Sequence, residues 1–393
     1  MRKITLFLLA ILLLSIISPI TAQANRLTIM ASHSILADVV ANVGGESINT
    51  ETLIPLGADP HAFQPSPRDL ASVASADIVF TNGALLEEGL LDTIENVASE
   101  TQIVIASSCI EVRLFGEDED GHENEDHTSD NVSLESLCDA HYAELGLETE
   151  AGHHRLFEAE CQGDDFHEDE DGHEDEDGHE DEDGHEDEDD HEDEDGHEDE
   201  DDHEDEDGHE HEHTETCDPH VWTTPKNVML WTLLIRDTLI ENDPDNADNY
   251  IANAEAYIEQ LQILENDFIQ TELARLPEQN RILVTNHDAF GYFADAYNFQ
   301  IVSTIIPGSS TLAEASASSI VDVVETINAT GVLAIFSENT MSEDIAQQIA
   351  SETGAEVYVL YSGALGQEGS PASTYLNYMR YNVSTIVDAL TTD

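Results

Sequence analysis

Cationic side chains are scarce in this sequence. Its 393 residues include 11 Lys and Arg against 87 Asp and Glu, a formal net charge of −76 at pH 7. A field of that sign repels phosphate backbones and anionic lipid headgroups, which excludes nucleic acid as a partner. Many of the carboxylates are concentrated in one stretch, 117–216, so the rest of the chain keeps a composition that can form ordinary hydrophobic cores.

Cysteine is also rare. The four cysteines lie within or beside the acidic stretch, at Cys109, Cys138, Cys161 and Cys217. No C-x-x-C spacing occurs, which argues against a redox motif or a zinc ribbon. In an oxidising compartment the four can form two disulfide bonds at the base of the acidic stretch, and all three pairings stay open.

Only one long apolar run is present, and it lies at the N-terminus. Arg2 and Lys3 precede the run Ile4–Ile17, and Ala22-Gln23-Ala24 then forms a small-residue cleavage pattern. The run is shorter than the ~20 residues that span a bilayer. We therefore predict a signal peptide over 1–24 and an exported protein, periplasmic or otherwise extracytoplasmic. No cysteine lies near the cleavage pattern, so lipidation is not expected at that point.

Outside the acidic stretch, short β-branched runs alternate with amphipathic segments. This pattern predicts an α/β protein with two lobes, each a mainly parallel sheet flanked by helices. The expected strands are Leu27–Met30, Ile48–Ile54, Ile78–Phe80, Gln102–Ala106, Arg281–Val284, Ile301–Thr304, Val332–Phe336 and Glu356–Leu360. The expected helices include Ser34–Asn42, Pro67–Ser75, Leu312–Ile327 and Glu343–Thr353.

A long linking helix is predicted over 244–276, between an N-terminal metal-binding lobe (25–243) and a C-terminal lobe (277–393). The segment has no internal Pro or Gly and repeats apolar residues at helical spacing. Asp243 before Pro244 is a plausible N-cap. At 1.5 Å per residue, ~30 residues reach about 45 Å, enough to join both lobes stiffly.

The acidic stretch 117–216 contains a repeated unit, His-Glu-Asp-Glu-Asp-(Gly/Asp). A six-residue unit with four carboxylates has nothing apolar to bury, which predicts a disordered His-rich acidic loop. Neutral imidazoles bind zinc, and carboxylates concentrate cations, so we interpret the loop as a weak metal collector; the alternative is an acidic spacer with incidental histidines. Its expected auxiliary ligands are His167, His173, His179, His185, His191, His197, His203, His209, His211 and His213.

Three other histidines are candidate ligands: His61 and His287 follow predicted strands, and His220 lies just after the acidic stretch returns to the fold. Clefts of open parallel sheets form at the carboxyl ends of their strands, so these imidazoles can converge on one zinc ion between the lobes. Each has a structural alternative, since His61 can hold a turn, His220 can pack on Trp222, and His287 can start a helix. The joint pattern favours the metal site.

The motifs around these histidines resemble those of the zinc-class metal-binding solute receptors of ABC importers, the cluster A-I substrate-binding proteins. They are Asp-Pro-His-x-(aromatic)-x-Pro-x-Pro-x-Asp at 59–69, Asp-Pro-His-Val-Trp at 218–222 and His-Asp-Ala-(aromatic)-Gly-Tyr-Phe at 287–293. With the linking helix, the resemblance covers essentially the whole mature chain. It implies a monomeric extracytoplasmic receptor, not an enzyme, that binds zinc tightly and delivers it to a membrane permease.

The resemblance assigns metal-binding positions to His61, His220 and His287. The third position carries a histidine rather than a carboxylate, and in this the chain resembles the zinc receptors of the family more than the manganese receptors. Family members often place a carboxylate after the last strand, where this sequence has Gly363. A site completed by water or another carboxylate is therefore expected. Glu338 is the candidate fourth ligand; alternatively it supports a ligand or caps a helix.

Three further residues have expected supporting roles. Asp59 and Asp288 are candidates to orient imidazoles, although Asp59 can equally hold its own turn. His33 follows the first strand, and we interpret it as a surface or packing residue.

Two other functions remain as alternatives. One is a metal buffer or surface interaction protein that meets no permease. The other is a zinc-dependent hydrolase, because three histidines with a zinc-bound water are also a hydrolytic arrangement.

Overall fold

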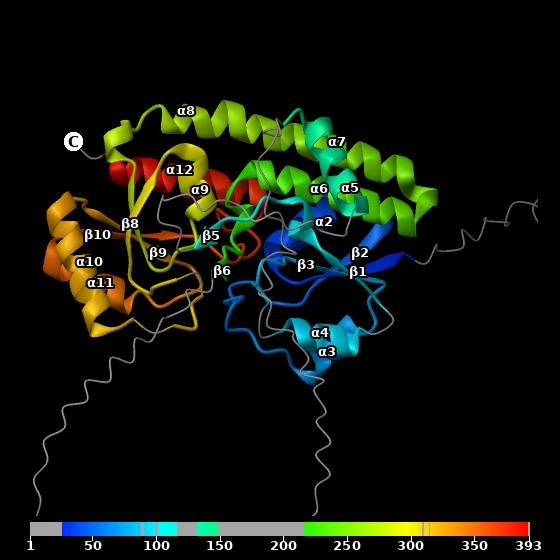
Figure 1. Ribbon diagram of the computed structural model, residues 1–393, viewed down its shortest axis with the longest axis horizontal. Coiled ribbons are helices and arrows are strands. Elements are labelled where there is room, and N and C mark those ends of the chain that lie inside the picture. Colours follow the sequence, from blue (N-terminus) through cyan, green and yellow to red (C-terminus); the bar gives the residue numbers. More distant parts are fainter. Residues whose placement is uncertain are drawn as a thin grey trace, which may run out of the picture. The chain divides into compact units, whose positions relative to one another are not determined.

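The computed structural model describes the two lobes and the segments that join them (Figure 1). The described residues are 26–87, 90–98, 101–115, 132–147, 216–308, 310–313 and 315–391. The predicted signal peptide and all ten auxiliary histidines of the acidic loop lie outside them. No membrane-crossing helix is found in the part of the chain that the structure describes.

The N-terminal lobe contains a four-stranded parallel sheet in the order β2-β1-β3-β4. Its strands are β1 (Leu27–Ala31), β2 (Ile48–Thr52), β3 (Ile78–Thr81) and β4 (Gln102–Ile105), and its helices include α2 (Ser34–Gly44), α3 (Pro67–Val73) and α4 (Leu91–Val97). The central strands β1 and β3 carry fully buried apolar side chains such as Ile29 and Phe80. Burial on both faces is typical of a parallel sheet covered by helices.

The C-terminal lobe repeats this plan with the order β10-β9-β7-β8. Its strands are β7 (Ile282–Thr285), β8 (Gln300–Thr304), β9 (Ala334–Glu338) and β10 (Glu356–Leu360), with helices α9 (Gly291–Tyr297), α10 (Ala317–Thr330) and α11 (Asp344–Thr353). The prediction of two parallel α/β lobes is confirmed. Helix α10 starts later than the expected Leu312, because Ser316 and Ser319 form a reciprocal capping box that begins the helix at Ala317.

The segment after Asp243 is helical throughout, although it is less regular than predicted. A 3₁₀ turn (Pro244–Asn246) leads into α7 (Ala247–Ile263), a π-helical segment (Leu264–Ile269) and α8 (Gln270–Leu273). Asp243 lies at the N-cap position before Pro244, as predicted, but its carboxylate caps no backbone N–H; it accepts hydrogen bonds from the Tyr250 hydroxyl at 2.7 Å and the Asn246 side chain at 2.8 Å. These side-chain contacts add to the backbone hydrogen bond from the Asn246 N–H to the Asp243 carbonyl at 3.1 Å.

The lobes are also joined by the helix at the end of the chain, α12 (Tyr375–Leu390). It packs on α8 and on α2 of the N-terminal lobe. The backbone N–H of Tyr375 donates to Asp38 at 3.0 Å, and that of Leu365 donates to Ser34 at 2.9 Å. Another long helix, α6 (Pro225–Asn242), packs along α7.

Part of the predicted acidic loop is a helix. Helix α5 (Val132–Leu145) packs on α6 through buried Tyr142, and a disulfide joins Cys138 to Cys109 with their Cα atoms 5.0 Å apart. The prediction that the whole of 117–216 is a loop is therefore wrong for this helix. No described cysteine is free, and Cys161 lies outside the described residues.

Both ends of the acidic stretch meet in a small ribbon. Strands β5 (Leu114–Phe115) and β6 (Thr216–Cys217) pair antiparallel, with Leu114 opposite Cys217. The ribbon is continued by a hydrogen bond from the Asp218 N–H to the Arg113 carbonyl at 2.7 Å. The two ends of the insertion therefore meet close to His220, which lies three residues after β6.

Candidate metal centre

The structure brings the three predicted histidines together. His61 lies in the turns after β2, His220 three residues after β6, and His287 two residues after β7. The Nε2 atom of His220 is 3.2 Å from Nε2 of both His61 and His287. Among the described residues, these three form the group of potential metal ligands, with one nitrogen from each within 4.8 Å of the others.

These separations match one tetrahedral cation. Zinc binds imidazole nitrogen at about 2.0–2.1 Å, which places two ligands of a tetrahedron roughly 3.3 Å apart. His220 and His287 are almost completely buried, whereas His61 is partly exposed. The site therefore has one histidine on its solvent side.

The imidazole of His220 is fixed by a carboxylate in its own loop. Oδ1 of Asp218 accepts hydrogen bonds from Nδ1–H of His220 at 2.9 Å and from its backbone N–H at 3.0 Å. Because the same Oδ1 also accepts the backbone N–H, it acts as an acceptor, so the ring proton lies on Nδ1 and Nε2 is left with a lone pair. Support of this kind sets the tautomer of a ligating histidine.

The imidazole of His287 is fixed by a carboxylate that is distant in sequence. Oε1 of Glu338, at the end of β9, is 2.6 Å from Nδ1 of His287 and 3.2 Å from its backbone nitrogen. Strand β9 lies beside β7 in the sheet, which brings together residues that are 51 positions apart. Glu338 thus lies behind His287, in the supporting arrangement that was the alternative to its ligand role.

The other expected supporting residues take different positions. Oδ1 of Asp59 accepts from the backbone N–H of His61 at 3.0 Å, and its Oδ2 accepts from Thr311 at 2.6 Å, so Asp59 holds its turn and links it to the C-terminal lobe. Asp288 faces Arg113 at 3.9 Å. His33 is buried with its ring 4.9 Å from that of Trp222, which confirms packing and excludes the surface alternative.

Burial keeps two of the three imidazoles neutral. Desolvation, with the neighbouring His220 and His287, lowers the pKa of His61 to about 2. Burial likewise holds the pKa of His220 well below its usual value. Burial also opposes charge on His287, but the adjacent Glu338 outweighs it and raises its pKa. Protons therefore compete for this site chiefly at His287.

The loop after β10 leaves no room for an additional side chain. A Cβ atom on Gly363 would lie 2.8 Å from Cδ and 2.9 Å from Cγ of Pro60, the residue before His61. Such contacts require the ring of Pro60 to move. Gly363 therefore allows the loop after β10 to lie directly against Pro60, next to His61.

Sequence reasoning missed the roles of Asp218 and Arg113. Burial raises the pKa of Asp218 to about 7, and the nearby Arg113 works in the opposite direction, towards ionisation. The recurrence of Asp-Pro-His at 59–61 and 218–220 was a usable signal, because each aspartate accepts the backbone N–H of its histidine. Nothing in the local sequence points to Arg113.

A convergence of imidazole lone pairs from two α/β lobes defines the class of protein as a two-lobed solute receptor for a cation. A family model described as zinc-uptake complex component A, periplasmic, matches residues 29–389, and the chain belongs to this family. It is a metal-binding substrate-binding protein of ABC importers, located outside the cytoplasmic membrane, and not an enzyme.

Relatives differ in the metal that their names state. The manganese-binding lipoprotein MntA of Halalkalibacterium halodurans is 28% identical over 369 residues, covering 94% of this chain and 90% of its own. The metal ABC transporter substrate-binding lipoprotein SsaB of Streptococcus sanguinis is 24% identical and covers 94% and 91%. Among solved structures, the periplasmic zinc-binding protein TroA of Treponema pallidum is 20% identical with a TM-score of 0.63, covering 93% of this chain and 99% of its own.

Proposed function

We propose that this protein captures zinc outside the membrane through His61, His220 and His287 and presents it to the permease of an ABC importer. Asp218 and Glu338 hold two of the imidazoles in the binding tautomer. We further propose that the ten histidines of the acidic loop collect zinc weakly and that the receptor acts as a monomer.

One observation carries the zinc site: the buried lone pairs of His220 and His287 face each other at 3.2 Å, while both Nδ1 atoms already face carboxylates. Two lone pairs at that distance repel unless a metal ion or a shared proton lies between them. An all-nitrogen donor set suits zinc, whereas manganese sites favour oxygen donors. This chemistry supports zinc even though some relatives are named for manganese.

The test is the metal carried by untagged protein, combined with uptake by cells that lack its gene. We expect one tightly held zinc ion per chain, and loss of zinc uptake that returns with the wild-type gene and not with a His220→Ala gene. Manganese in the isolated protein, with loss of manganese uptake instead, would overturn the zinc assignment. Unchanged uptake of both metals would favour the buffer alternative.

A further inference from the structure

We propose that Arg113 is a positioning residue for the metal centre, which ties the support of His220 to the lobe that carries His287. This inference rests on the proposed function, because it concerns how the same three imidazoles are held. Arg113 touches no candidate ligand and would act through Asp218.

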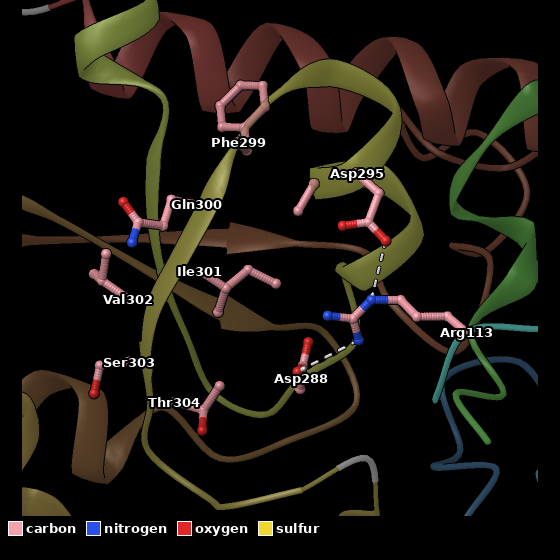
Figure 2. A pocket seen from close by; sticks show the side chains of 10 residues that line it. Arg113, Asp288, Asp295, Phe299, Gln300, Ile301, Val302, Ser303 and Thr304 are labelled. Carbon is pink, nitrogen blue, oxygen red and sulfur yellow. Dashed lines mark hydrogen bonds and ion pairs between the residues drawn. The ribbon is translucent and has the colours of Figure 1, made fainter. Parts of the chain in front are cut away.

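The guanidinium of Arg113 contacts carboxylates of both lobes, and Figure 2 shows the two in the C-terminal lobe, Asp288 and Asp295. Its Nη1 is 3.5 Å from Oδ2 of Asp218, the carboxylate whose Oδ1 holds His220. The same Nη1 is 3.9 Å from Asp288, the residue after His287, and Nε donates to Asp295 of α9 at 3.1 Å. The guanidinium of Arg113 therefore lies between carboxylates that belong to opposite lobes.

A second set of contacts fixes the same junction. The hydroxyl of Tyr292, on α9, accepts the backbone N–H of Arg113 at 2.9 Å and donates to the carbonyl of Asp218 at 3.0 Å. A further hydrogen bond joins the Asp218 N–H to the Arg113 carbonyl. These three hydrogen bonds fix the backbones of Arg113 and Asp218 to each other and to Tyr292 of α9.

Gly291, the first residue of α9, provides the space for this contact. A Cβ atom there would lie 2.6 Å from Nη1 of Arg113 and 2.6 Å from Oδ2 of Asp218. The helix can approach the ion pair only because this residue has no side chain. Gly291→Ala therefore disturbs the contact between Arg113 and Asp218 without removing any charge.

The buried carboxylates around Arg113 explain why a basic side chain is needed at this position. Asp218 is fully buried, Asp288 is mostly buried, and Arg113 lies within 4 Å of a carboxylate oxygen of each. Without Arg113, Oδ2 of Asp218 loses this counter-ion. Oδ1 is then less firmly aimed at His220, and the imidazoles of the two lobes are held together less firmly.

The experiment compares zinc affinities of the full-length protein in competition with a chelator, under conditions that leave weak sites empty. We expect Arg113→Gln to weaken tight binding by roughly 10- to 100-fold, as loss of a ligand-supporting contact does. Arg113→Lys should recover part of the loss. Arg236→Gln is the matched control, because Arg236 pairs with Glu144 and Asp237 away from the three histidines.

Two further measurements separate positioning from general destabilisation. The visible absorption of cobalt bound at the tight site reports ligand geometry, and it should change in Arg113→Gln but not in Arg236→Gln. Gly291→Ala should weaken zinc binding with every charge retained, and it decides the outcome if Arg113→Gln does not fold.

The inference is overturned if a folded Arg113→Gln protein, or Gly291→Ala in its place, binds zinc within twofold of the wild type while His220→Ala loses tight binding. If His220→Ala itself keeps tight binding, the proposed metal centre fails instead. The two failures are therefore distinguishable.

Discussion

The two lobes solve the same chemical problem in different ways. Each lobe fixes one buried imidazole by a carboxylate on Nδ1. The N-terminal lobe uses Asp218, two residues from His220, and balances it with Arg113. The C-terminal lobe uses Glu338, 51 residues from His287, and brings it close through the pairing of strands. A ligand can thus be oriented by a local turn or by sheet topology, and only the first leaves a pattern in the sequence.

The largest expected effect comes from removing a ligand from either lobe. His61→Ala, His220→Ala and His287→Ala should each abolish tight zinc binding, because two imidazoles and water cannot replace three nitrogen donors. Calorimetric titration with a competing chelator measures this loss. His141→Gln serves as the control, since His141 is buried against Asp237 outside the site. Tight binding that persists in all three alanine variants would refute the site.

A smaller loss of zinc affinity is expected when either supporting carboxylate, Asp218 or Glu338, is replaced. Asp218→Asn and Glu338→Gln should each weaken zinc binding by roughly 10- to 100-fold, because an amide can present an N–H to Nδ1 and favour the wrong tautomer. The same chelator competition compares the two variants. A loss of tight binding in Glu338→Gln as complete as in His287→Ala would show that Glu338 ligates the metal.

A separate pH dependence of stability arises from His33, a buried histidine of the N-terminal lobe that is not a candidate ligand. Burial lowers the pKa of His33 to about 3, so between that pH and 6.5 the unfolded chain binds a proton that the folded chain does not. Stability must then fall as the pH drops, by about 2 kcal/mol from pH 7 to pH 5 for one such histidine. Urea unfolding of metal-free protein at both pH values should show this loss reduced by about 2 kcal/mol in His33→Phe. An unchanged pH dependence would contradict the assignment.

The smallest expected change in tight binding follows removal of 162–214, which carries the ten auxiliary histidines. Removal of this segment leaves α5 and the disulfide between Cys109 and Cys138 in place. The number of weakly bound zinc ions should fall, while the tight affinity stays within a few-fold of the wild type. A deletion of 117–216 is the informative contrast, because it also removes α5. Equal numbers of bound ions before and after the shorter deletion would support the acidic spacer.

The sequence predicted the two sheets and the three histidines because both depend on local patterns. Alternating β-branched and amphipathic segments define the strands, His61 and His287 follow predicted strand ends, and His220 lies in a second Asp-Pro-His motif. Helix α5 was missed because it lies within a strongly acidic stretch, where its place is set by the disulfide and by burial of Tyr142 against α6. The supporting position of Glu338 and the part played by Arg113 depend on which segments become neighbours, which no local pattern encodes.

The paired ends of the acidic stretch, at Phe115 and Thr216, have a kinetic consequence. If the acidic stretch binds zinc weakly as proposed, an ion held there stays within reach of His220, and linkage turns its transfer to the tight site into an intramolecular step. The rate of that transfer would then depend on the length of the intervening chain, as well as on the zinc that the medium supplies.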